Sequence, residues 1–192
     1  MSRTVAKNLA REIEDHLSGD SKDQSTAARL ISNVGGVGLL RNPSEADLPA
    51  EQLRTTLRFW QSLPKVQGIP NAVKIDPEKL LSVLGYLMLI DIDKKNDDFR
   101  YSVYGTKIAE VTGFDMTGKS VWDIATTSSI QVFFAACYMA AEAMRCPLYT
   151  VHEPPREITV NHWHRLILPL GLNGEIKRFL VCNMPIVSNE LR

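Results

Sequence analysis

The stretch LGYLMLIDIDKKNDDFRYSVYGTKIAEVTGFDMTGKSVWDI, residues 84–124, decides the fold because it reads as a β-hairpin that leads into short helices. Apolar and polar residues alternate over 87–93, a polar turn covers 94–98, and the alternation returns over 99–104. This period of two predicts two antiparallel strands with one buried face. The residues assigned to that face are Met88, Ile90, Ile92, Phe99, Tyr101 and Val103.

Residues downstream of the hairpin predict a long helix and three further strands. The helix covers 130–145 and is apolar nearly all round, so we expect neighbours to cover it on two sides. The strands cover 148–153, 158–170 and 175–187, and an Asn-Gly pair forms the turn between the last two. Pro169 inside a strand pattern predicts a sheet edge or a bulge, because proline cannot donate a ladder hydrogen bond.

Three segments upstream of the hairpin have apolar residues at helical spacing: 4–17, 26–33 and 50–63. Between the second and the third lies the glycine cluster GGVG, residues 35–38. It has no preceding strand and no Gly-Lys-Ser/Thr, so we interpret it as a turn or a helix end instead of a phosphate-binding loop.

From residue 57 onward the chain carries five short motifs: LRFWQSLP (57–64), IDPEKL (75–80), FRYSVYGT (99–106), GFDMTGKS (113–120) and RLILPLGLNGE (165–175). In their order and spacing they resemble the PAS-like family found mainly in alphaproteobacteria. Many members of that family are small stand-alone proteins.

The resemblance implies an α+β fold with a PAS-like, antiparallel five-stranded sheet, short helices, one long helix across the sheet and preceding N-terminal helices. The PAS-like domain would cover 70–192, and residues 1–69 would form a helical extension that dimerises or docks. Because such a fold hosts many functions, the resemblance implies a sensor or interaction module and leaves its ligand and output open. The residues that hold haem or flavin in other PAS families cannot be located here, so the cofactor stays unknown.

The composition excludes several classes of partner. The 22 basic residues balance 22 acidic ones, so no overall field favours nucleic acid. The longest apolar stretch, 132–141, is too short to span a membrane, and the charged N-terminus lacks the apolar run of a signal peptide. The 3 cysteines are odd in number and have no C-x-x-C spacing, which indicates a reduced, cytoplasmic protein.

Two sets of apolar side chains are candidates for a partner interface. The first helix carries Val5, Leu9 and Ile13 on one stripe, which must pack on its own domain or on a second copy. Since PAS-like domains often dimerise through N-terminal helices, the resemblance favours a homodimer contact. Phe59 and Trp60 stand beside arginines on the third helix, where they form either core or the contact surface for a partner protein.

A binding site in this fold would be the concavity between the inner face of the sheet and the helices across it. The same apolar residues serve equally well as a filled core, and the sequence leaves both interpretations open. The side chains predicted to line the pocket are Met88, Ile90, Tyr101, Val103, Trp122, Phe133, Cys137 and Leu166.

The sequence offers little catalytic chemistry. His162 and His164 share one face of a strand and would ligate a metal if Cys182 or a carboxylate completed the set, but no further ligand lies at motif spacing. No G-x-S-x-G motif is present, and neither Cys137 nor Cys182 has an evident activating base. We therefore predict no catalytic residue and no metal site.

The predicted function is a non-enzymatic signalling or regulatory module. It would bind a small ligand, a downstream protein partner or both, and pass on its state through helix rearrangement. One alternative is a purely structural protein-protein adaptor that uses Phe59 and Trp60. Another is a small α+β enzyme with an apolar pocket and His162 or His164 as a base.

Overall fold

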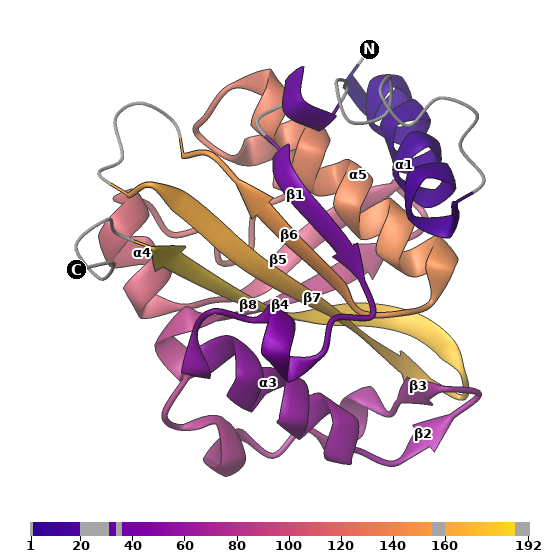
Figure 1. Cartoon of the computed structure of the whole chain (residues 1–192), viewed down its shortest axis with the longest axis vertical. Coiled ribbons are helices and arrows are strands. Elements are labelled where there is room, and N and C mark those ends of the chain that lie inside the picture. Colours follow the sequence, from indigo (N-terminus) through magenta and orange to yellow (C-terminus); the bar gives the residue numbers. More distant parts are fainter. Residues whose placement is uncertain (1, 20–30, 34–35, 155–159, 187–192) are drawn as a thin grey trace.

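The structure is a computed structural model that describes residues 2–19, 31–33, 36–154 and 160–186. Its centre is a six-stranded sheet in the order β1-β6-β7-β8-β4-β5, in which every neighbouring pair is antiparallel (Figure 1). The strands are β1 (Gly36–Arg41), β4 (Leu87–Asp93), β5 (Asp98–Tyr104), β6 (Leu148–His152), β7 (His162–Leu172) and β8 (Glu175–Ile186).

All five predicted strands are present, which confirms the α+β class and the antiparallel sheet. The sheet has one strand more than predicted, because β1 pairs with the edge strand β6. The interpretation of the glycine cluster as a turn or helix end is therefore wrong for Gly36 to Gly38. Glycine is required at position 36 because a Cβ there would lie 2.5 Å from Ile31 and 2.8 Å from Phe133.

The helices cover both faces of the sheet. They are α1 (Ser2–Ser18), α3 (Glu51–Ser62), α4 (Thr106–Thr112) and α5 (Ser128–Met144). Short 3-10 turns lie at Glu45–Asp47, Ala72–Lys74, Pro77–Leu80, Leu84–Tyr86 and Val121–Asp123, and Lys65–Val66 pairs with Ile69–Pro70 as the β2–β3 ribbon. The helix predicted over 26–33 lies mostly outside the described residues. No helix in the described part of the chain is long and apolar enough to cross a membrane.

Helix α5 lies on the inner face of the sheet, and α1 covers the opposite side of α5 (Figure 1). Small residues let the two helices approach each other closely: Ala6 and Ala10 are buried on α1, and four alanines are fully buried on α5. This arrangement explains why α5 is apolar nearly all round, as the sequence predicted. The cover is supplied by the same chain.

Helix α1 places the predicted interface residues in two environments. Leu9 and Ile13 are buried in the core beside α5, whereas Val5 is 49% exposed. Lys7 forms an ion pair with Asp97 in the β4–β5 turn, and the Arg3 guanidinium lies 5.5 Å from the Trp122 ring. The helix is therefore docked on its own domain along most of its apolar stripe.

Helix α3 packs on the outer face of the sheet and forms a second core there. Phe59 and Trp60 are buried in this core, and Trp60 Nε1 donates a hydrogen bond of 2.8 Å to the carbonyl of Pro169. Strand β6 pairs with β7 only as far as Ile167, so Pro169 lies where β7 has lost one neighbour. Of the edge or bulge that the sequence predicted at Pro169, the structure shows the local edge.

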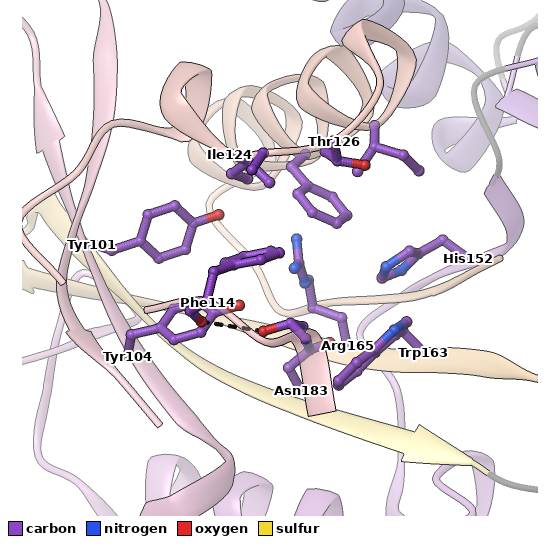
Figure 2. A pocket seen from close by; sticks show the side chains of 13 residues that line it. Tyr101, Tyr104, Phe114, Ile124, Thr126, His152, Trp163, Arg165 and Asn183 are labelled. Atoms are coloured by element: carbon purple, nitrogen blue, oxygen red, sulfur yellow. Dashed lines mark hydrogen bonds between the residues drawn. The ribbon is translucent and has the colours of Figure 1, made fainter. Parts of the chain in front are cut away.

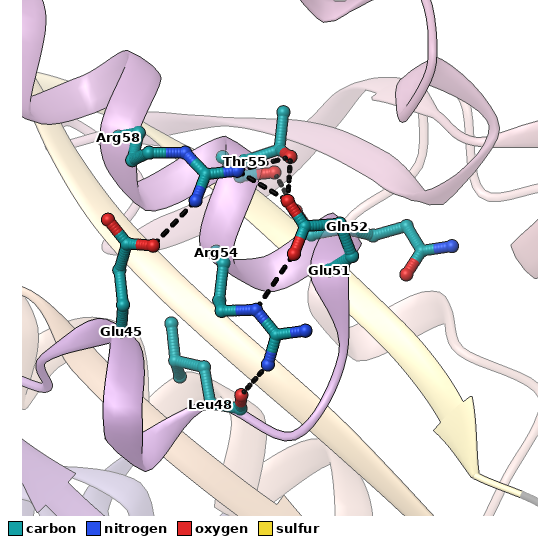
Figure 3. A network of polar contacts seen from close by, with 8 residues as sticks. Glu45, Leu48, Glu51, Gln52, Arg54, Thr55 and Arg58 are labelled. Carbon is teal, nitrogen blue, oxygen red and sulfur yellow. Dashed lines mark hydrogen bonds and ion pairs between the residues drawn. The ribbon is translucent and has the colours of Figure 1, made fainter.

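Surface ion pairs link the start of α3 to the preceding turn at Glu45–Asp47 (Figure 3). Arg58 forms ion pairs with Glu45 and Glu51, and Arg54 bridges Glu51 and the carbonyl of Leu48. The hydrogen bonds from Arg54 and Arg58 lower the pKa of Glu51 to about 2. Since these side chains are exposed, we assign them an orienting role and little stability.

Candidate functional site

A cavity of about 240 Å³ lies between the inner face of the sheet, the first half of α5 and the loops that follow α4 (Figure 2). Its walls are mostly aromatic and aliphatic, with a few polar side chains among them. The lining residues are Tyr101, Tyr104, Thr112, Phe114, Ile124, Ala125, Thr126, Ile130, Phe134, His152, Trp163, Arg165 and Asn183.

A β-bulge in β5 shapes one wall of the cavity. Tyr101 pairs with Ile90 while Val103 pairs with Leu89, so Ser102 is an extra residue in β5. The extra residue shifts the alternation by one position, and Tyr104 follows Tyr101 onto the inner face. The two rings meet edge to face with their centroids 5.6 Å apart.

Three polar residues cross the centre of the sheet in one row. Thr150 on β6 pairs with Arg165 on β7, and Arg165 pairs with Asn183 on β8. Residues that stand opposite each other in neighbouring strands point to the same face, so the row faces α5 and the inner core. All three are buried, which is unusual for an arginine and an asparagine.

Arg165 is held by aromatic rings from α5. Its guanidinium carbon lies 3.6 Å from the ring centroid of Phe134, and Nη1 lies 3.4 Å from the hydroxyl of Tyr138. The side chain is only 3% exposed, and no ion pair among the described residues includes it. Stacking on an aromatic face fixes the plane of the guanidinium and leaves its edge available.

Four buried polar atoms of the lining have no hydrogen-bond partner among the described residues. They are Thr126 Oγ1, His152 Nδ1, Arg165 Nε and Asn183 Oδ1. Each such atom costs free energy, on the order of 1–3 kcal/mol, when it is removed from water without a partner. All four atoms belong to residues that line this one cavity.

The cavity carries a single formal charge at neutral pH. Burial, reinforced by Arg165 and by His164 and His162, holds the pKa of His152 well below its usual value, so the imidazole is neutral. Burial also raises the pKa of Tyr101 well above its usual value and that of Tyr104 to about 12. The other lining residues do not titrate near neutral pH, so Arg165 provides the only charge.

A family model for the PAS domain matches residues 49–181, which is more than half of the chain. The chain belongs to the PAS domain family. A search of the curated proteins and a search of the solved structures found no match. Membership indicates a signalling or sensory module in general terms, and the cavity lies between the sheet and the long helix of this PAS domain.

Of the eight residues predicted to line a pocket, Tyr101 lines the cavity of the PAS domain. Four more, Met88, Ile90, Phe133 and Cys137, are buried in the inner core, where they pack without facing the cavity.

The remaining three predicted pocket residues lie elsewhere. Leu166 points to the outer face and packs in the α3 core, because it follows Arg165 by one residue in a strand. Val103 is 43% exposed as a result of the bulge at Ser102. Trp122 is half-buried beneath Arg3 of α1.

Sequence reasoning did not single out the polar row, although a signal for it was present. Trp163, Arg165 and Ile167 alternate along β7, so an apolar inner face carries one arginine at its centre. A charged residue with apolar neighbours at every second position is expected to be buried and paired. Asn183 on β8 gives the same signal between Val181 and Pro185.

The histidines and cysteines of the PAS domain lie apart from one another. His164 contacts the hydroxyl of Tyr149 on the outer face, whereas His152 lies on the inner face. No group of three or more metal-ligating side chains is present in the described part of the chain. Burial raises the pKa of the Cys137 and Cys182 thiols to about 12, so both stay protonated and unreactive.

Proposed function

We propose that this PAS domain is a non-enzymatic sensory module that binds a small molecule in the cavity and passes on its occupancy through α5 and α1. The observation that carries this proposal is the set of four unpartnered polar atoms around one cavity. A filled core would leave these atoms without hydrogen bonds at a cost in stability, whereas a bound molecule would supply partners. The polar atoms therefore favour the pocket over the filled core.

Contacts connect the cavity wall to helices α5 and α1. Phe134 and Ile130 of α5 line the cavity, and Gln131 of α5 donates hydrogen bonds of 3.0 and 2.9 Å to the carbonyls of Trp122 and Ile124. Arg3 of α1 lies over the ring of the same Trp122. A ligand that moves Phe134 or the loop at Ile124 would thus move the start of α5 and its contact with α1.

A ligand shifts these helices only if it binds two helix arrangements with different affinity. In our proposal, the arrangement with α1 docked on α5 is one state, and a loosened α1 is the other. Output then passes to a partner protein, with homodimerisation through the exposed side of α1 around Val5 as the proposed assembly.

Native and denaturing mass spectrometry of the purified protein tests the proposal. We expect a native mass above a whole multiple of the chain mass, with the excess lost on denaturation. Hydrogen exchange then tests the transmission step, and we expect changed protection in α1 when the released molecule is added back. Unchanged exchange in α1 at saturation would contradict the proposed helix rearrangement.

A further inference from the structure

We propose that the ligand of this cavity is a small monocarboxylate, whose carboxylate pairs with Arg165 and whose apolar body packs on the aromatic walls. The inference rests on the proposed function, because it names the chemical class that the same site would take. Three observations carry it: the unpaired charge, the geometry of the guanidinium and the size of the cavity.

The charge argument follows from a comparison of two buried ions. Asp98 and Arg165 are the buried charged residues in the described part of the chain. Asp98 is fully partnered, since it accepts hydrogen bonds from Ser120 at 2.6 Å and from the amide of Phe99 at 2.8 Å, and Arg100 lies 3.6 Å away.

Arg165 has no comparable set of partners. Among the described residues, its guanidinium makes one hydrogen bond, to Tyr138, and lies over the rings of Phe134 and Tyr138. A buried ion that lacks a counter-ion destabilises the fold, and an anion within the cavity would compensate for this. The fold therefore leaves room for a negative charge beside Arg165.

The geometry favours a carboxylate over other anions. Phe134 covers one face of the guanidinium and Tyr138 accepts from Nη1, so the Nε edge is the part of the guanidinium that lacks an acceptor. A carboxylate matches two parallel donors of a guanidinium. A phosphate carries about two charges at neutral pH, and the neutral His152 adds no second cation to balance it.

The size and walls of the cavity define the rest of the ligand. A volume of about 240 Å³ exceeds the roughly 150 Å³ of an apolar cavity that takes up benzene. By the same proportion, the whole ligand, carboxylate included, has about ten non-hydrogen atoms, as in a one-ring aromatic acid or a short fatty acid. At the wall, Asn183 Oδ1 would accept a hydrogen bond from a hydroxyl of such a molecule, and the Thr126 hydroxyl would donate one to an oxygen.

Calorimetric titration of the full-length protein with matched pairs of probes tests the inference. The pairs are benzoate with benzamide, phenylacetate with phenylacetamide, and hexanoate with hexanamide. We expect at least one acid to bind about tenfold or more tightly than its amide, because a charge-assisted hydrogen bond is lost in the amide. Amides that bind as tightly as the acids would overturn the inference and leave the proposed function intact.

The variant Arg165→Met keeps the length of the side chain and removes its charge. We expect it to lose the preference for the acid while it still binds the amide, and Arg165→Lys to retain part of the preference. Arg178→Met is the matched control, because Arg178 pairs with Asp91 on the surface, and we expect it to bind like the unaltered protein. An acid preference that survives in Arg165→Met would overturn the inference.

Two further outcomes separate the inference from the function on which it rests. If no acid binds and native mass spectrometry shows a neutral bound molecule, the carboxylate is wrong and the sensory pocket stands. If no acid binds and no bound molecule is found, both proposals fail. The comparison of acid with amide uses the unaltered protein, so it decides the question even if Arg165→Met does not fold.

Discussion

The guanidinium carbon of Arg165 lies 3.6 Å from the ring centroid of Phe134, and this contact joins the centre of the sheet to helix α5. Phe134 also meets the ring of His152 edge to face, with the centroids 4.9 Å apart. The aromatic ring therefore touches both polar groups at one end of the cavity. Any molecule that pairs with Arg165 must lie against the helix that packs on α1.

The first prediction concerns the stability of the protein without ligand. Replacing Arg165 by Met removes a buried, unpaired charge and keeps most of the packing against Phe134. We expect the free energy of unfolding to rise by about 1 kcal/mol, since the lost cation–π contact offsets part of the gain. Urea unfolding of both proteins, free of added acids, measures the change. A loss of stability would show that Arg165 is structural.

The second prediction concerns the outer core. Trp60→Phe removes the donor to Pro169 while it keeps an aromatic ring, so we expect a loss of about 1–3 kcal/mol in the free energy of unfolding. Val66→Ala, at an exposed position of the β2–β3 ribbon, is the control and should change the value by less than about 0.5 kcal/mol. Equal effects of the two changes would contradict the buried placement of Trp60.

The third prediction tests the bulge at Ser102. Ile90 is fully buried and Val103 is exposed, although both were assigned to one buried face by alternation. We expect Ile90→Ala to cost about 2–5 kcal/mol and Val103→Ala to cost less than about 0.5 kcal/mol. Thermal or urea unfolding gives both values. A large loss in Val103→Ala would mean that the strand alternates without a bulge.

The fourth prediction concerns pH. The pKa of His152 is held well below 6.5 in the folded protein, so the unfolded chain binds a proton that the folded chain does not. The stability from the neutral imidazole is therefore fully present above pH 6.5 and falls as the pH drops below it, by up to about 1.4 kcal/mol per pH unit.

Urea unfolding at about pH 7.5 and about pH 5.5 measures this dependence. We expect His152→Gln to lose less stability than the unaltered protein between the two values, because Gln does not titrate. An identical loss in both proteins would show that His152 does not cause the dependence.

The sequence predicted the order of the strands and helices well because each depends on local periodicity. Strand β4 follows from the alternation of apolar and polar residues. The ends of α5 follow from capping and helix-breaking residues within a few positions of each end. Strand β1 was missed because its glycines resemble a turn, and the reason for Gly36 is a long-range contact with Phe133. Contacts of this kind have no signature in a single sequence.

The cavity was harder to predict than the core. Alternation identified Tyr101 but not Tyr104. The extra residue at Ser102 turns every later residue of β5 to the opposite face, and the sequence around Ser102 does not indicate a bulge. Arg165 and Asn183 were not predicted to line the pocket, because the pocket was predicted from the apolar residues of each strand alone. Only the pairing of β6, β7 and β8 shows that they stand side by side.

The 3 tryptophans of the chain offer the most direct test of the account, because each reports on a different place. Trp163 lines the cavity, Trp122 lies under Arg3 of α1, and Trp60 is buried on the outer face. The measurement is the indole NMR signal of each during titration with phenylacetate, assigned with single Trp→Phe variants. We predict that Trp163 and Trp122 shift together and saturate at one concentration while Trp60 stays unchanged. A Trp163 signal that does not move, or equal shifts in all three, would contradict a ligand-binding cavity coupled to α1.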